Sequence, residues 1–388
     1  MFKSLKNRTP LGWLQLKHDK MKMLTALAGI AFADILMFMQ LGFKDALFTT
    51  NTQYPRLVDG DIVLLSTQAT NFNKLYTFPR RRLYQAMDVP GVESAETVYI
   101  GSFNWRNPIT REKNSMMVIG FDPERPAFDL PEVNRQLDRV KIPDTVLFDR
   151  ASRGKYDEMI ARVEQGIPVT TESERTTITI GGLFEVGASF ADDGALITSD
   201  YNFLRLFAKK QQGTVSLGVI NLESGQDPIV TRRALNAYLP KDVKAYTHEE
   251  YVDKEVTYLQ NRSPIGFVFT LGTTMGFIVG IVIVYQVLST DVNDHLAEYA
   301  TFKAMGYKNS YFLLVVFEEA LILSIAGFIP SVALALGLYR LTATATALPI
   351  VLPLSRAIVV LILTIVMCGV SGAIATRKLQ SADPADIF

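Results

Sequence analysis

The sequence predicts a membrane α-helical protein with four transmembrane helices and an α+β extracytoplasmic domain between the first helix and the other three. Two observations predict this fold class: four apolar runs are long enough to cross a bilayer, and one long polar stretch separates the first run from the rest. The 48% content of hydrophobic residues fits a mixed membrane and soluble architecture. Equal numbers of acidic and basic residues give no indication of a nucleic-acid partner.

The first span is predicted at residues 23–43, where 21 residues as a helix cover about 31 Å, close to the roughly 30 Å of a hydrocarbon core. The basic residues before it also fit a signal peptide, but no small-residue cleavage site follows the apolar run. Residues 1–22 mix Trp13 and leucines with lysines, which fits a cytoplasmic amphipathic elbow. An irregular basic leader that only sets topology fits them equally well.

Three further spans are predicted near the C-terminus, at residues 265–288, 312–341 and 357–375. The third span contains Gly327 and Pro330, so we expect a kink there.

Basic residues in the short flanking segments predict the orientation of the chain. Residues 1–22 carry six Lys or Arg against one Asp, which places the N-terminus in the cytoplasm. Alternation then puts residues 44–264 outside, and residues 289–311 and the tail 376–388 inside. We therefore expect an inner-membrane protein with both termini cytoplasmic and a large periplasmic domain.

The predicted extracytoplasmic domain, residues 44–264, alternates short β-rich runs with amphipathic helical segments. The segment that ends it, residues 249–263, predicts a helical stalk continuous with the second span. The acids Asp192 and Asp193 predict a solvated turn. The chain has one cysteine and three dispersed histidines, so no metal site is predicted. No catalytic motif is found, so no catalytic residues are predicted. The predicted strands are 62–66, 98–103, 115–121, 145–148, 177–186 and 215–222.

The sequence contains no G-x-x-x-x-G-K-[ST] motif: around Gly154 and Lys155, Asp149 replaces the first glycine and Tyr156 the hydroxyl residue. The chain is therefore not predicted to be an ATPase. Any ATP-driven work would need a second subunit.

The cytoplasmic segment 289–311 predicts a short helix that Gly306 ends. Leu296, Tyr299 and Ala300 share one face of this helix, and charged residues surround them. Such a helix fits a groove on a partner protein. A connecting loop without a partner is the alternative that periodicity alone leaves open.

The run Glu298–Gly306 resembles the E-x-x-x-[LM]-[KR]-A-[LMI]-G signature of FtsX/MacB-type ABC transporter permeases, with Phe302 at the usual aliphatic position. Residues 317–321 (FEEAL) and the tail with Arg377, Lys378 and Pro384–Ala385 resemble further motifs of that family. His295 stands where many members carry arginine. Three segments resemble in particular the DevC branch, the permeases of DevBCA exporters: residues 29–43 (GIAFADILMFMQLGF), 191–203 (ADDGALITSDYNF) and 284–307.

The resemblance implies a MacB-type periplasmic core domain and a homodimer that binds an ABC ATPase subunit of the DevA type. It also implies a DevB-like periplasmic adaptor and a TolC-like outer-membrane channel. ATP and Mg would be bound by the ATPase partner, so no cofactor is expected in this chain. ATP-driven closure at the coupling helix would be relayed to the extracytoplasmic domains, with glycolipid as the implied cargo.

The leading hypothesis is an exporter permease for a lipid or another amphipathic cargo. Two intramembrane acids are functional candidates: Glu319, unless water reaches it from the interface, and Asp34, which is alternatively placed at a dimer seam. A second hypothesis is an FtsX-like mechanotransmitter that regulates an extracytoplasmic wall hydrolase, and a third is a membrane-anchored enzyme. The predicted ATPase-coupling residues are His295, Glu298, Tyr299, Phe302, Lys303 and Gly306.

Overall fold

The computed structural model of the chain describes residues 20–172, 176–207, 213–262, 264–296, 298, 301, 305–307 and 309–381. These residues form two compact units. The helical unit comprises residues up to Asp45, Phe267–Thr342 and the chain from Ile350; the α/β unit comprises Ala46–Gly266 and Ala343–Pro349.

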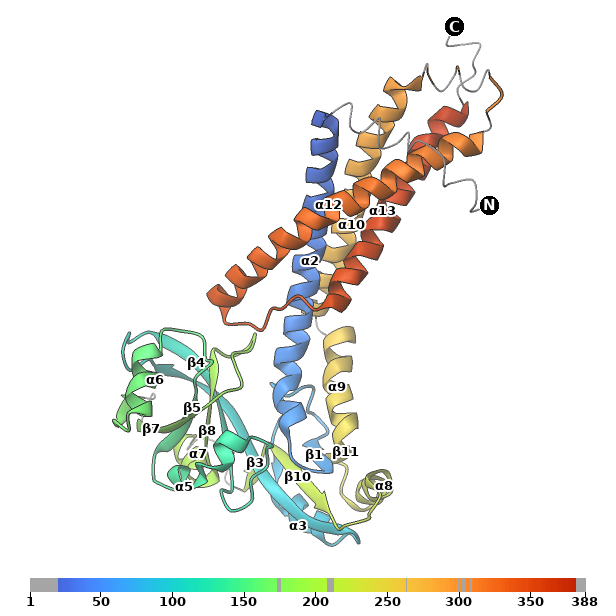
Figure 1. Cartoon of the computed structure of the whole chain (residues 1–388). Coiled ribbons are helices and arrows are strands. Elements are labelled where there is room, and N and C mark those ends of the chain that lie inside the picture. The colour runs from blue at the N-terminus through green and yellow to red at the C-terminus, as the bar shows by residue number, and fades with distance from the viewer. Residues whose placement is uncertain are drawn as a thin grey trace. The chain divides into compact units, whose positions relative to one another are not determined.

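Four of the described helices are long and apolar enough to cross a membrane, which confirms the predicted fold class (Figure 1). They are α2 (Lys20–Leu57), α10 (Pro264–Asp294), α12 (Asn309–Thr346) and α13 (Leu354–Ser381). All four contribute to one apolar core that contains Ile30, Leu288, Val316 and Met367. Packing against one another leaves most of their remaining apolar surface for lipid.

Glycine residues allow close packing of α2 against α10 and of α10 against α13. A Cβ on Gly29 of α2 would lie 2.3 Å from Ile283, and one on Gly280 of α10 would lie 2.0 Å from the Met367 sulfur. Small residues are the usual means of close helix packing in membranes, where apolar burial gives no driving force between helices.

The described strands of the α/β unit form a nine-stranded sheet of order β11-β1-β10-β3-β4-β8-β5-β7-β6, and β2 pairs with β9 separately. The strands are β1 (Ile62–Ser66), β2 (Phe78–Pro79), β3 (Val92–Arg106), β4 (Lys113–Phe121), β5 (Thr145–Asp149), β6 (Val169–Glu172), β7 (Thr177–Phe184), β8 (Gly194–Ser199), β9 (Thr214–Val215), β10 (Leu217–Leu222) and β11 (Val243–Thr247).

The first part of the sheet has a split β-α-β arrangement. Strands β11, β1, β10 and β3 are antiparallel neighbours, and helices α3 (Arg81–Met87) and α8 (Pro228–Tyr238) connect them. This is the ferredoxin-like order. The segment from β4 to β9 is inserted between β3 and β10, and its strands β4 to β8 extend the same sheet.

Helices cover both faces of the sheet because its central strands are apolar on both sides. Ile62 and Leu64 of β1 belong to one core and Val63 and Leu65 to the other, as the alternation of a strand requires. Residues of α3, α6 (Asp157–Glu164), α7 (Asp200–Leu206) and α8 pack in the first core. The second core contains residues from the end of α2 and from three further helices, α4 (Pro131–Asn134), α5 (Leu137–Val140) and α9 (His248–Asn261).

The expected continuous stalk is wrong. Helix α9 begins with a capping box between Thr247 and Glu250 and ends at Asn261, and α10 begins at Pro264. Proline lacks the N–H that would continue a helix and disfavours helical geometry in the residue before it. Helix α2 runs without a break from the helical unit into the α/β unit and extends to Leu57.

The expected solvated turn at Asp192 is also wrong. This residue is 7% exposed, and its carboxylate accepts hydrogen bonds from Ser115 at 2.8 Å and Ser102 at 3.3 Å. Desolvation raises its pKa above the ordinary value. The neighbouring Asp193 accepts from Asn114 and pairs with Arg153, so both acids hold a loop against the sheet.

Candidate functional site

The candidate coupling segment connects α10 to α12. Three of its predicted residues, Tyr299, Phe302 and Lys303, lie outside the described part of the chain. Glu298 is exposed to solvent, as a contact residue for a partner would be. Gly306 has φ +92°, a left-handed conformation that favours glycine, so the predicted helix-ending role fits its backbone.

His295 lies at the end of α10 and is held by its own helix. Its Nδ1 is 3.0 Å from the Asp291 carbonyl oxygen and 3.7 Å from the Asp291 carboxylate. Its side chain is 20% exposed, against 51% for the neighbouring Asp294. Asp294 forms an ion pair with Lys22, which connects the start of α2 to the end of α10.

A buried acidic pair lies behind this segment. Asp291 of α10 is 6% exposed and Glu319 of α12 is 1% exposed, and the two carboxyl groups are close enough to interact electrostatically. Among the described residues, Glu319 Oε2 has no hydrogen-bond partner. Glu319 therefore belongs to the interior of the helical unit and is not reached by water in the single chain.

Asp34 is fully buried among three helices. Its carboxylate accepts hydrogen bonds from Ser331 of α12 at 3.0 Å and from Thr364 of α13 at 2.7 Å. These bonds compensate part of the cost of burying a carboxyl group at membrane depth. A place at a dimer seam is therefore wrong for Asp34, because the chain's own helices surround its side chain.

Sequence reasoning missed Arg356, which joins three segments of the helical unit. Its guanidinium pairs with Asp45 of α2 and donates to the Tyr339 hydroxyl at 3.1 Å and the Val351 carbonyl at 2.7 Å. Tyr339 in turn donates to the carbonyl of Phe38. The available signal was an arginine just before the fourth apolar run, but nothing in the sequence identified Asp45 as its partner.

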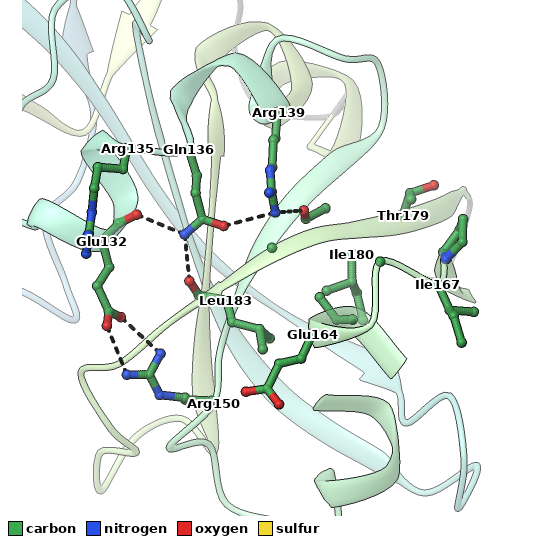
Figure 2. Close-up of a pocket in the computed structure, with 15 residues that line it drawn as sticks. Glu132, Arg135, Gln136, Arg139, Arg150, Glu164, Ile167, Thr179, Ile180 and Leu183 are labelled. Atoms are coloured by element: carbon green, nitrogen blue, oxygen red, sulfur yellow. Dashed lines mark hydrogen bonds and ion pairs between the residues drawn. The ribbon is translucent and has the colours of Figure 1, made fainter. Parts of the chain in front are cut away.

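A groove of about 790 Å³ lies along β7 in the α/β unit. Strand β6 pairs with Thr177–Ile180 only, so the next residues of β7 have no strand partner on that side within the described chain. Side chains from α5 and the residue before it replace the strand (Figure 2). Gln136 donates to the Leu183 carbonyl at 2.8 Å, and Arg139 donates to the Gly181 carbonyl at 2.8 Å.

The wall of this groove also holds an ion-pair network. Arg150 contacts Glu132 at 3.0 Å and Glu185 at 2.9 Å. The hydrogen bond from Arg150 is the main cause that lowers the pKa of Glu132. With the carbonyls of Gly181 and Leu183 and the carboxylate of Glu132 bonded within the chain, this part of the groove is a capped sheet edge.

The described residues include no group of three His, Cys, Asp or Glu side chains placed to hold a metal ion.

Comparison with known proteins gives one family match and a set of similar solved domains. Residues 270–384 match the family model described as "FtsX-like permease C-terminal". No curated protein matches the chain. The periplasmic region of MacB from Actinobacillus actinomycetemcomitans is similar at 8% identity and a TM-score of 0.35, over 54% of this chain and 96% of that one.

The extracellular domain of the noncanonic ABC-type transporter YknZ from Gram-positive bacteria is similar at 12% identity and a TM-score of 0.30, over 48% of this chain and 100% of that one. TM-scores this low do not carry a functional argument. The family match covers α10 from residue 270, the coupling segment, α12 and α13. Residues 270–384 are therefore similar to the C-terminal domain of FtsX-like permeases.

Proposed function

We propose that this chain is the permease subunit of a MacB/DevBCA-type ABC exporter that moves a lipid or another amphipathic cargo, with ATP hydrolysis by a separate ATPase subunit. One observation carries the proposal: the FtsX-like permease match spans three of the four membrane helices and the segment between α10 and α12. A permease without a P-loop needs a place where an ATPase can act, and this segment provides one.

Packing behind the segment supports force transmission. Val292 near the end of α10 and Leu296 just beyond it pack in the core that joins all four membrane helices. Val316 and Ala320 of α12 pack there too. Glu298 is exposed beside them. A movement imposed on the segment would therefore shift α10 and α12 together, because packed interiors transmit displacement.

The proposed topology follows the basic residues before α2. Both termini and the coupling segment would be cytoplasmic, and the α/β unit would be periplasmic at the inner membrane. A homodimer, a DevA-like ATPase, a DevB-like adaptor and a TolC-like channel complete the proposed assembly. A glycolipid is the cargo that the DevC resemblance favours.

The proposal is tested by comparing envelope lipids in cells that lack the chain with cells that carry Glu298→Lys or Phe302→Asp. We expect a lipid to accumulate inside the cell in all three strains, because reversing a contact charge or placing a carboxylate in an apolar contact uncouples the ATPase. Glu93→Lys is the matched control, since Glu93 is an exposed acid in the α/β unit. It should leave export unchanged.

Other outcomes have distinct meanings. Unchanged lipids with a failure of cell-wall cleavage would replace the exporter by an FtsX-like regulator of a wall hydrolase. Unchanged export and unchanged ATPase association in both coupling variants would remove the coupling role from this segment.

A further inference from the structure

A second cavity of the α/β unit, of about 470 Å³, has a lining unlike that of the groove beside β7. Ala151, Val186, Ala188 and the segment Ala343–Pro349 form most of its wall, and Thr49 and Gln53 of α2 close one side. Every one of these residues belongs to the α/β unit. The volume is within the range of pockets that hold small organic ligands.

The chemistry of the wall favours an apolar ligand. None of the residues that line the cavity carries a charge, and alanine, valine, leucine and proline dominate. Gln53 already donates its amide to the Gly187 carbonyl at 3.1 Å. A sugar or phosphate would find few hydrogen-bonding groups here and would lose those it makes with water, whereas an alkyl chain loses nothing.

Chain connectivity places the cavity beside the membrane surface. Ala343 lies in the last turn of the candidate span Leu313–Thr346. Thr49 is four residues beyond Asp45 on the continuous helix α2, or about 6 Å along the helix axis. The polar headgroup layer on each side of a hydrocarbon core has about this thickness, so the wall begins where acyl chains end.

The segment that closes the cavity is fixed in place. Arg153 donates to the Thr346 carbonyl at 2.6 Å and also pairs with Asp193 at 3.1 Å. Leu348 is 6% exposed. Ala347 has φ +52°, a left-handed conformation that costs free energy in a residue other than glycine and that persists only where the surroundings hold it.

From these observations we infer that the cavity binds the alkyl chain of an amphipathic molecule that leaves the adjoining membrane. This inference rests on the proposed export function and names the part of the cargo that the α/β unit contacts first. Arg153 acts through the segment it holds and does not contact the ligand.

Photolabelling of the purified full chain in phosphatidylcholine nanodiscs tests the inference. The probe is a phosphatidylcholine with a diazirine at the end of one acyl chain. After irradiation, we expect mass spectrometry to find labelled peptides that contain residues 343–349 or 186–188. Two filling variants, Ala343→Phe and Thr49→Phe from the opposite wall, should each reduce this labelling at least fivefold, because the ring occupies the space of the chain.

Ala345→Phe is the matched control: Ala345 is an exposed alanine two residues from Ala343 that does not line the cavity. It should label like the unmodified chain. A second arm repeats the experiment with a photoreactive single-chain fatty acid, and preference for one probe distinguishes a bilayer phospholipid from a single-chain amphipath. Equal labelling in both filling variants and the unmodified chain, or labels confined to α10, α12 and α13, would overturn the inference.

The result is independent of ATP and of any partner. Absence of labelling at residues 343–349 and 186–188 in the unmodified chain, with export uncoupled by Glu298→Lys, would reject the cavity and leave the proposed exporter intact. Retained labelling with normal export in Glu298→Lys cells would reject the coupling assignment and leave the cavity intact. Thermal unfolding of each filling variant in the same nanodiscs shows whether it is folded.

Discussion

Gly306 has a left-handed backbone conformation, and the proposed coupling role depends on that conformation. A Cβ at this position would meet no atom within 4 Å, so a substitution acts through φ +92° alone. We expect Gly306→Ala to cost roughly 1–2 kcal/mol locally and to reduce export, because the left-handed conformation is unfavourable for alanine. Gly306→Asn should retain more export, since asparagine tolerates this conformation better.

Export measured in cells, with the amount of chain in the membrane as control, checks this prediction. Equal export by the alanine and asparagine variants would show that the left-handed turn is not needed.

Glu255 of α9 predicts a pH dependence of stability in the α/β unit. It is 2% exposed, it accepts a hydrogen bond from the Phe72 amide at 3.0 Å, and burial raises its pKa to about 7. The folded chain therefore binds a proton that the unfolded chain has released between its ordinary pKa of 4.5 and about 7. Stability should fall as pH rises through this window, by at most about 3 kcal/mol for this group.

Thermal unfolding of the full chain in nanodiscs at pH 5 and pH 7.5 measures this effect. Glu255→Gln should flatten the difference between the two values, because glutamine keeps the shape of the side chain without a titrating proton. An undiminished difference in that variant would assign the dependence to other buried acids, such as Asp149 and Asp192, whose pKa values burial also raises.

At the scale of single elements, the side chains that cap β7 predict a measurable stabilisation. Gln136 and Arg139 each satisfy a carbonyl that would otherwise remain unpaired at a sheet edge. We expect Gln136→Leu with Arg139→Met to destabilise the chain by about 1–3 kcal/mol and to promote aggregation. Arg135→Met is the control, because Arg135 bonds only to Pro131 of its own helix among the contacts described.

Thermal unfolding and light scattering of the purified variants check this expectation. If the double variant unfolds and aggregates like Arg135→Met, the two caps contribute nothing and the β7 edge is protected in some other way.

Elements with a strong local pattern were predictable from the sequence. The run at 62–66 is β1 with the predicted bounds, the run at 145–148 lies in β5, and the run at 177–186 covers β7 but extends two residues beyond its end at Phe184. Strands β8 and β11 were missed, because Gly194–Ser199 follows a polar turn and Val243–Thr247 lies between two helices and is short. Their strand character comes from pairing with β4 and β1.

The candidate site was predictable only in part. The signature run predicts a coupling role for the segment between α10 and α12, and the charges of Asp34 and Glu319 in apolar runs marked these residues as unusual. Their partners, Ser331, Thr364 and Asp291, come from other helices, so spacing along the chain could not identify them. The Arg356–Asp45 pair and the cavity behind Ala343 depend on tertiary contacts in the same way.

At the scale of the whole molecule, the chain passes between its two units four times, and the passages differ. Helix α2 passes at Asp45–Ala46 and α12 at Thr342–Ala343 without interruption, whereas the passage at Gly266–Phe267 lies just after the break between α9 and α10. The last two passages flank the segment 343–349, which Arg153 holds to the α/β unit. A continuous helix transmits axial force and rotation, but a junction between two helices transmits less. Helix α12 ends at Thr346, soon after its passage, whereas α2 continues to Leu57 inside the α/β unit, so α2 is the best candidate for the relay.

Lys44→Pro tests this relay, because it removes one helical hydrogen bond next to the boundary between the units and kinks the helix at a cost of about 3 kcal/mol. Lys44→Ala is the matched control: it loses the same contact to Thr270 but keeps the helix. We expect export to fail in the proline variant and to persist in the alanine variant, with equal ATPase association in both. Arg262→Gly should be tolerated, since α9 has already ended at Asn261. Normal export by Lys44→Pro together with a loss in Arg262→Gly would assign the relay to the α9–α10 junction instead.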